Sequence, residues 1–164
     1  MRRLAPHVEA GLVIAFRVPG LLPVPQGSKR HVGGGRMVER DDLKPWREAV
    51  TLLALRACGY ARPSIDRPAL CVVEFTFPRP AAPKRHTDPH RKDTAPDVDK
   101  LARAVFDALT AAAIVRDDAR FADLVALKRY GDPGAYIVVS TGELDLPAIV
   151  RHARATEPLE LDAA

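Results

Sequence analysis

Four stretches of the chain combine apolar, β-branched and aromatic residues in the manner of β-strands. The first runs from Val8 to Val18, and the second, from Ala69 to Phe77, ends at a proline. The other two, Ala122 to Tyr130 and Ala135 to Ser140, are separated by Gly131-Asp132-Pro133-Gly134, a turn sequence of the hairpin type. The pattern predicts four strands, the last two joined by a tight turn.

Two other stretches repeat their apolar residues at helical spacing. One lies between Lys44 and Cys58, with Asp42 as a candidate N-cap, and its apolar positions are Trp46, Val50, Leu52, Leu53 and Ala57. The other begins at Pro96 or Asp97, and its apolar stripe consists of Leu101, Val105, Ala108, Leu109 and Ala112. We expect each stripe to pack against the sheet.

The resulting order, β-α-β-α-β-β, predicts an α/β protein with a small mixed sheet of about four strands and two main helices packed on it. A chain of 164 residues with 47% hydrophobic content suits one such core, hence a single domain. We expect the domain to cover residues 1–145. Residues 146–164 are expected to form a tail, with a short helix followed by disorder.

The sequence contains no run of about 18 apolar residues that could span a membrane, and its first residues lack the apolar core of a signal peptide. We therefore expect a cytoplasmic protein that does not associate with membranes. Its two cysteines, Cys58 and Cys71, have neither metal-ligand spacing nor a disulfide framework around them, so we expect buried thiols.

The net charge of +4 is unevenly distributed along the chain. Residues 1–92 carry a net charge of +9, and residues 93–164 a net charge of −5. A basic half suits a polyanion such as DNA, although solvated surface charge is the alternative explanation. Two proline-rich connections, residues 19–36 and 78–95, hold the basic residues that we expect to contact phosphates: Lys29, Arg30, Arg36, Lys84, Arg85, Arg91 and Lys92.

Acidic residues gather where the second helix begins and again after it ends. Asp97 and Asp99 lie at its start, Arg103 follows Asp99 by one turn, and Asp117-Asp118 come after the helix. Taken singly, each acid has a structural explanation as a cap, a partner of the helix dipole or a turn former. Taken together, they indicate a site for Mg²⁺ or Mn²⁺, which prefer oxygen ligands, and hence phosphodiester hydrolysis.

This segment resembles a known family, the RusA-like crossover junction endodeoxyribonucleases, also called Holliday junction resolvases. The family pattern is Asp-x-Asp-Asn-Leu-x-Lys-Ala-x-x-Asp-Ala-Leu, followed by Asp-Asp before a strand. Here it reads from Asp97 to Leu109 without a gap, followed by Asp117-Asp118. Two earlier stretches, residues 24–30 and Lys44-Pro45-Trp46, are similar to the front end of phage-type members, so the resemblance covers most of the chain.

The resemblance implies roles for individual residues. Asp97, Asp99 and Asp118 would be catalytic ligands of Mg²⁺, for which Mn²⁺ can substitute, and Asp117 would orient the site or bind the metal through water. A RusA-like nuclease domain would then cut four-way DNA junctions by paired symmetric hydrolysis in recombination and repair. Because the junction has two-fold symmetry, the expected assembly is a C₂ homodimer.

Two positions depart from the family pattern. The family lysine is Arg103 here, which keeps a positive charge for the scissile phosphate but cannot act as a proton donor. The family asparagine is Lys100, which either replaces the missing lysine or contacts DNA. These departures leave two alternatives open: a protein that binds branched DNA without cutting it, and a nuclease that acts on flaps, forks or RNA.

Overall fold

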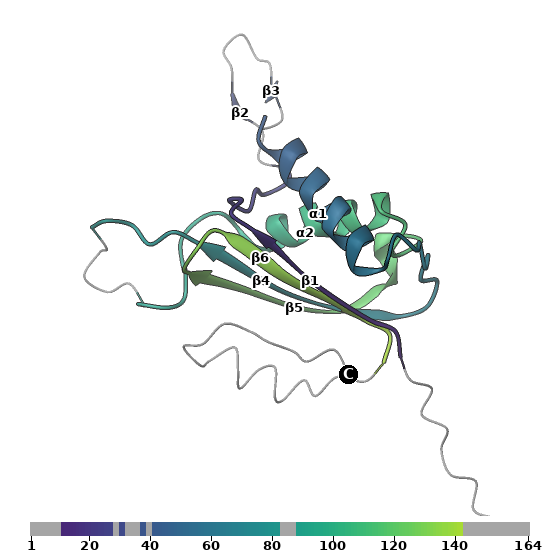
Figure 1. Ribbon diagram of the computed structural model, residues 1–164. Coiled ribbons are helices and arrows are strands. Elements are labelled where there is room, and N and C mark those ends of the chain that lie inside the picture. The colour runs from purple at the N-terminus through teal and green to yellow at the C-terminus, as the bar shows by residue number, and fades with distance from the viewer. Residues whose placement is uncertain (1–10, 28–29, 32–36, 39–40, 83–87, 143–164) are drawn as a thin grey trace, which may run out of the picture.

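The computed structural model describes residues 11–27, 30–31, 37–38, 41–82 and 88–142, so the predicted tail lies outside the described residues. A four-stranded mixed sheet carries both helices on one face (Figure 1). Its strands, in the spatial order β1-β6-β4-β5, are β1 (Val13–Pro19), β6 (Gly134–Ser140), β4 (Ala69–Phe77) and β5 (Phe121–Tyr130). The predicted fold class is confirmed.

The strand boundaries differ from their predictions mainly at β1. β4 has its predicted bounds, and β5 and β6 each begin one residue early. β1 begins at Val13 and not at Val8, and residues 8–10 lie outside the described residues. It continues through Pro19, which is tolerated because β1 is an edge strand that does not need every backbone N–H for pairing.

The predicted hairpin between the last two strands is wrong. β6 pairs antiparallel with β4 and β1, while β5 pairs parallel with the opposite side of β4. Every residue of β6 is buried, and an outer position beyond β5 would have exposed them. The turn after β5 therefore crosses the end of β4, so close that a Cβ on Gly131 would lie 2.9 Å from Cγ2 of Thr76.

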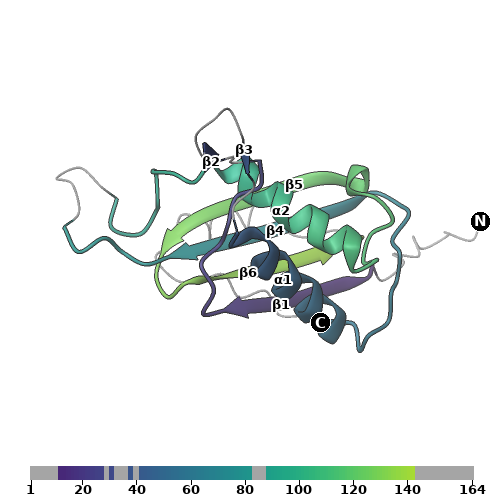
Figure 2. The same cartoon turned by 90° about the horizontal axis from the view of Figure 1, so that it is seen from above.

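The two helices lie side by side on the sheet (Figure 2), α1 (Leu43–Ala57) towards β1 and α2 (Val98–Ala111) towards β5. All five residues of the predicted α2 stripe are fully buried. In α1 the buried residues are Leu43, Trp46, Val50 and Ala54. Leu52 and Ala57 were predicted in the stripe but are exposed, because the helix turns them away from the sheet and into solvent.

The remaining described elements are short. β2 (Arg30–His31) and β3 (Met37–Val38) form a separate antiparallel ladder that projects beyond the start of α1 (Figure 1). A 3₁₀ turn, η1 (Asp118–Arg120), precedes β5. Cys71 is buried in β4, whereas Cys58, at the end of α1, is only partly buried. No helix among the described residues is long and apolar enough to cross a membrane.

Candidate functional site

The first acids of the motif stand where the chain turns into α2. Asp97 is the N-cap residue, with extended backbone angles, but its side chain makes no capping hydrogen bond. Its carboxylate instead lies 2.7 Å from Nζ of Lys100. Asp99 belongs to the first helical turn and is exposed. The capping explanation for Asp97 is therefore not supported, and both carboxylates face solvent at the same end of the helix.

Lys100 determines the electrostatics of this end of α2. Its hydrogen bond and its charge hold the pKa of the Asp97 carboxyl below the ordinary value, and Asp97 in turn raises the pKa of Lys100. Both groups therefore stay ionised at neutral pH. A metal ion that bound Asp97 would compete with an ammonium group already in contact with it.

Two other charged residues of α2, Arg103 and Asp107, differ in their side-chain contacts. Arg103 is exposed, and among the described residues it forms no ion pair with Asp99. Asp107 is held by structural contacts: the side-chain amide of Gln26 donates a hydrogen bond to its carboxylate, and Arg47 lies 3.8 Å away. Asp107 thus ties the loop before β2 and helix α1 to α2. Arg103, in contrast, is exposed one turn after Asp99 and can act as a cation beside the acids.

Lys128 fixes the approach to α2, a role that the sequence did not reveal. From the end of β5, its Nζ donates hydrogen bonds to the backbone oxygens of Thr94, at 2.7 Å, and Pro96, at 2.8 Å. The backbone N–H of Lys92 donates to the Lys128 oxygen at 3.0 Å. The only signal in the sequence was strand alternation, which puts Lys128 on the helix side of the sheet and its neighbour Arg129 on the other.

The second acidic pair lies beyond the other end of α2. Oδ1 of Asp117 accepts a hydrogen bond from the backbone N–H of Ala119 at 2.8 Å, so Asp117 caps η1 and presents Asp118 to solvent. Arg116 and Arg120 both bind Asp66, at 2.5 and 2.9 Å, and anchor this turn. The carboxylate of Asp118 has no hydrogen bond or ion pair within the described part of the chain.

Within one chain the two groups of acids do not meet. Asp97 and Asp99 stand at the N-terminal end of α2 and Asp118 follows its C-terminal end, and the 14 residues of the helix span about 21 Å. Across residues 11–27, 41–82 and 88–142 no three His, Cys, Asp or Glu side chains are grouped so that they could hold one metal ion. Of the three predicted metal ligands, each chain therefore presents Asp97 and Asp99 at one end of α2 and Asp118 beyond the other end.

Most of the chain matches the model of a known protein family. The model of the family described as endodeoxyribonuclease RusA matches residues 21–140, which include both helices and all the acids above. The chain belongs to the RusA endodeoxyribonuclease family. A search of curated proteins found no match. RusA membership supports a nuclease of the hydrolase class, since the family is one of endodeoxyribonucleases, and the family acts on branched DNA.

The basic residues predicted to bind DNA are only partly described in this RusA chain. Lys29, Arg36, Lys84 and Arg85 lie outside the described residues, and Arg30 is part of the backbone ladder of β2. Arg91 is exposed and its Nε lies 3.0 Å from Asp88. Lys92 and Lys100 both line a hollow at the start of α2. The structure thus places two of the predicted cations in the same hollow as Asp97, and Lys100 contacts it directly.

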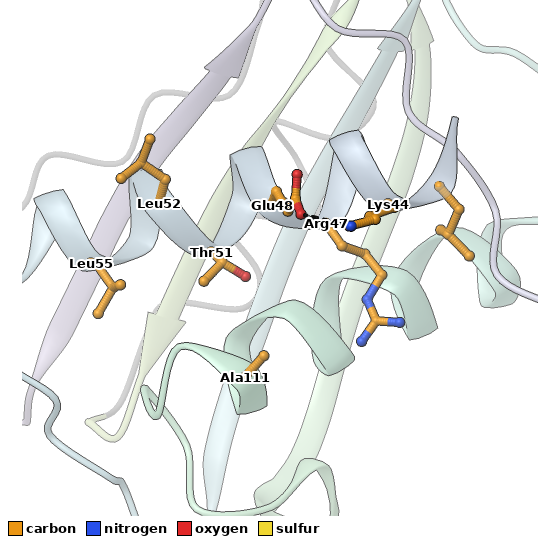
Figure 3. A pocket seen from close by; sticks show the side chains of 8 residues that line it. Lys44, Arg47, Glu48, Thr51, Leu52, Leu55 and Ala111 are labelled. Atoms are coloured by element: carbon orange, nitrogen blue, oxygen red, sulfur yellow. Dashed lines mark ion pairs between the residues drawn. The ribbon is translucent and has the colours of Figure 1, made fainter. Parts of the chain in front are cut away.

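A different groove of about 550 Å³ lies between the two helices of the RusA fold, and Figure 3 shows the side chains that line it. Its apolar surface comes from Leu52 and Leu55 of α1 and from Ala111 of α2. The charged residues at its rim include Lys44 and Glu48, which lie 3.8 Å apart. None of the motif acids lines this groove, so it is not part of the candidate site.

Proposed function

We propose that this chain is a Mg²⁺-dependent endonuclease that resolves Holliday junctions by paired symmetric cuts, acting in the cytoplasm in DNA recombination and repair. The observation that carries the proposal is the pair Asp97 and Asp99, exposed at one helix start and in the spacing of the RusA family. Asp118 supplies the third carboxylate of that pattern. The substrate follows from the family and from the basic residues beside the acids.

The carboxylates fit a divalent metal in their chemistry. All three are exposed, and Asp99 and Asp118 have no hydrogen bond or ion pair to other described residues, so their oxygens are available as hard ligands. Asp97 is available once Lys100 releases it. Mg²⁺ or Mn²⁺ held by Asp97, Asp99 and Asp118 would supply an activated water and stabilise the leaving oxygen. Asp117 contributes by fixing the turn that carries Asp118.

The cations of the chain bind and orient the substrate. Arg103, one turn after Asp99, is placed to neutralise the scissile phosphate, because its guanidinium is always charged and offers several donors. Lys92 and Lys100 hold neighbouring phosphates, and Lys128 keeps the backbone before α2 in place for them. None of these groups reads bases, so the affinity they supply depends on salt and on the path of the backbone.

A metal site with all three acids requires two chains. Since Asp118 is separated from the other acids by the length of α2, we propose that a C₂ homodimer pairs Asp97 and Asp99 of one chain with Asp118 of its partner. The two-fold axis then brings two α2 helices together in opposite directions and generates two identical sites. The exposed side of α2 and the neighbouring edge of β5, where Leu124 is 45% exposed, provide a surface for this contact.

The proposal is tested with three single variants, Asp97→Asn, Asp99→Asn and Asp118→Asn. Each keeps the shape of the side chain but removes the charge that a metal needs, so we expect cutting of a labelled four-way junction to fall by at least about 10²-fold. Junction binding, measured with a chelator present, should stay within about threefold of wild type, since the basic residues are kept. Glu48→Gln, which removes an exposed carboxylate of α1 away from the proposed site and dimer surface, is the matched control and should cut normally.

The ion pair between Lys100 and Asp97 favours a second candidate, a protein that binds branched DNA without cutting it. A cation in that position supplies part of the charge that a metal would bring. One experiment separates the two candidates: binding and strand cleavage by the wild-type protein are measured on a four-way junction and on a linear duplex, with added Mg²⁺. Tight junction binding with no strand cleavage, in Mg²⁺ and in Mn²⁺, would reject the nuclease and support the binding protein.

A further inference from the structure

A hollow of about 580 Å³ opens beside the acids at the start of α2, within the size range of small-ligand sites. Three separate segments form it: the loop after β1, the end of β4 and the connection that leads into α2. Its apolar walls come from Leu22, Pro23, Pro25, Phe77, Pro78 and Pro96. Asp97 and Lys100 form part of the same wall, so the hollow is continuous with the candidate metal site.

The walls of this hollow are fixed by hydrogen bonds to the core of the fold. On one side, the backbone N–H of Gly20 donates to Pro133 at 2.8 Å, and that of Gln26 donates to Lys100 at 3.0 Å. On the other side, the ammonium of Lys128 binds two backbone oxygens between residues 94 and 96. The hollow is therefore preformed, and an occupant does not have to order its walls.

The rim of the hollow is basic. Lys100 is neutralised by Asp97, but Lys92 has no ion pair among the described residues. Its ammonium lies 5.4 Å from the ring centre of Phe77 and 5.7 Å from that of Tyr130, and donates to Oγ1 of Thr94 at 2.5 Å. Partial burial and the nearby Lys128 lower the pKa of Lys92. A bound anion would stabilise the charged ammonium and offset both effects.

An occupant of this hollow needs an apolar, compact body and an attached anion. A nucleotide has both, since a base offers two apolar faces and its phosphate can reach Lys92 at the rim. We propose that the hollow receives one nucleobase of the DNA substrate, unstacked next to the phosphate that is cut. The proposal rests on the proposed function, because it takes the strand bound at Asp97 and Asp99 as the source of the base.

This assignment also explains a preference for branched DNA over linear duplex. A base inside a duplex must leave its stack to enter the hollow, and the free energy that this costs is least where pairing and stacking are already interrupted. At the crossover of a four-way junction the stack is interrupted by the branch. The hollow would thus add affinity at the branch point that the sequence-independent phosphate contacts cannot supply.

The experiment uses wild-type protein with a chelator, so that DNA is bound but not cut, and four-way junctions with a single 2-aminopurine at each position around the crossover. Leu22→Gln makes the wall of the hollow polar; Leu21→Gln is the matched control, because the adjacent leucine is also exposed but does not line the hollow. We expect a several-fold rise in fluorescence at one position in each of the two strands that are cut, reduced by at least half in Leu22→Gln and unchanged in Leu21→Gln.

A second measurement removes the base instead of the wall. Leu22→Gln should bind an intact junction about fivefold more weakly than wild type, and the two proteins should bind equally once the responding nucleotide is abasic. Tight junction binding and normal cutting in Mg²⁺, with flat fluorescence at every position and no effect of Leu22→Gln, would overturn the assignment of the hollow to a nucleobase but not the proposed function. Absence of any junction binding would overturn the proposed function together with it.

Sedimentation of both variants covers the other possible occupant, a second copy of the chain. A shift of Leu22→Gln towards monomers, without loss of the fluorescence response, would overturn the assignment to a nucleobase. An unchanged oligomeric state, together with a lost fluorescence response, supports it.

Discussion

Lys100 is the side chain that a metal ion would have to displace from Asp97. In this chain the lysine takes the place of the family asparagine and contacts the carboxylate at 2.7 Å. Ion pairs of this exposure contribute little to stability, but they matter where a second cation must use the same oxygens. Under the proposed function, we therefore expect Lys100 to change the metal dependence of cutting more than the stability of the fold.

The variant Lys100→Asn should lower the Mg²⁺ concentration that gives half-maximal cutting by about two- to fivefold, as expected for the loss of an exposed competing ion pair. The measurement is a Mg²⁺ titration of the initial cutting rate. Lys44→Asn is the matched control, because that ammonium pairs with Glu48 on α1 and not with the acids. A higher requirement for Mg²⁺ in Lys100→Asn would mean that Lys100 assists the metal site.

A pH effect is expected at Asp88, in the connection that carries Arg91 and Lys92. Backbone N–H groups of Arg91 and His90 lower the pKa of its carboxyl from 3.8 to about 2. A lowered pKa means that the folded turn is stabilised above pH 3.8 and loses this contribution as the pH falls towards 2. Carboxyl chemical shifts of Asp88 should titrate near 2; a midpoint near 3.8 would show that the turn does not form.

At the scale of elements, β4 and β5 position the site, because α2 connects them and Lys128 fixes its approach. The parallel pair has a buried ion pair on the face away from the helices, with Nε of Arg129 2.7 Å from Glu74. On the helix face, a bulge between Phe121 and Asp123 turns the side chain of Phe121 towards α2. Its ring stacks on that of Phe106, with the two ring centres 4.4 Å apart. Both contacts hold β5 in its register beside α2.

Arg129→Met should therefore lower the free energy of unfolding by about 3 to 5 kcal/mol, since it leaves the Glu74 carboxylate buried without this partner. The double variant with Glu74→Leu should recover most of the loss, because two apolar side chains replace two charges. Unfolding in guanidinium chloride measures the free energy of unfolding of both variants, with Arg56→Met on the exposed face of α1 as the control. Equal losses in the single and double variants would assign the effect to packing alone.

At the scale of the whole molecule, the separation of the acids by α2 is the decisive feature. Within a single chain, the candidate ligands Asp97 and Asp99 stand at one end of this helix and Asp118 follows its other end. A symmetric pair of chains can complete two sites, and a four-way junction needs two cuts. The same geometry would give a monomer neither complete site.

This arrangement predicts complementation between two inactive variants. When Asp99→Asn and Asp118→Asn chains are mixed and allowed to exchange, each mixed dimer contains one site with no substitution and one with both. We expect nicking to return to about a quarter of the wild-type level, because about half of the dimers are mixed and each has one active site. No recovery, in a mixture shown to contain mixed dimers, would place all three acids of a site in one chain.

The sequence by itself determined the elements and the candidate residues. β4, α1 and α2 could be predicted because strand alternation, helical periodicity and terminal signals such as Asp97 are local properties of the chain. The motif from Asp97 to Leu109 indicated the family for the same reason, and the family match confirms it. The shift of β1 and the exposure of Leu52 show where local patterns lose accuracy, at the ends and flanks of elements.

Only the tertiary structure decided how the strands are ordered and what surrounds the acids. The position of β6 between β1 and β4 depends on which arrangement buries both of its faces, and the turn sequence carries no such information. Likewise, Asp107 is bound by Gln26, Lys128 supports the chain before α2, and Leu22 meets Phe77 in one hollow, although these residues are far apart in sequence. Such contacts follow from packing, which no local pattern encodes.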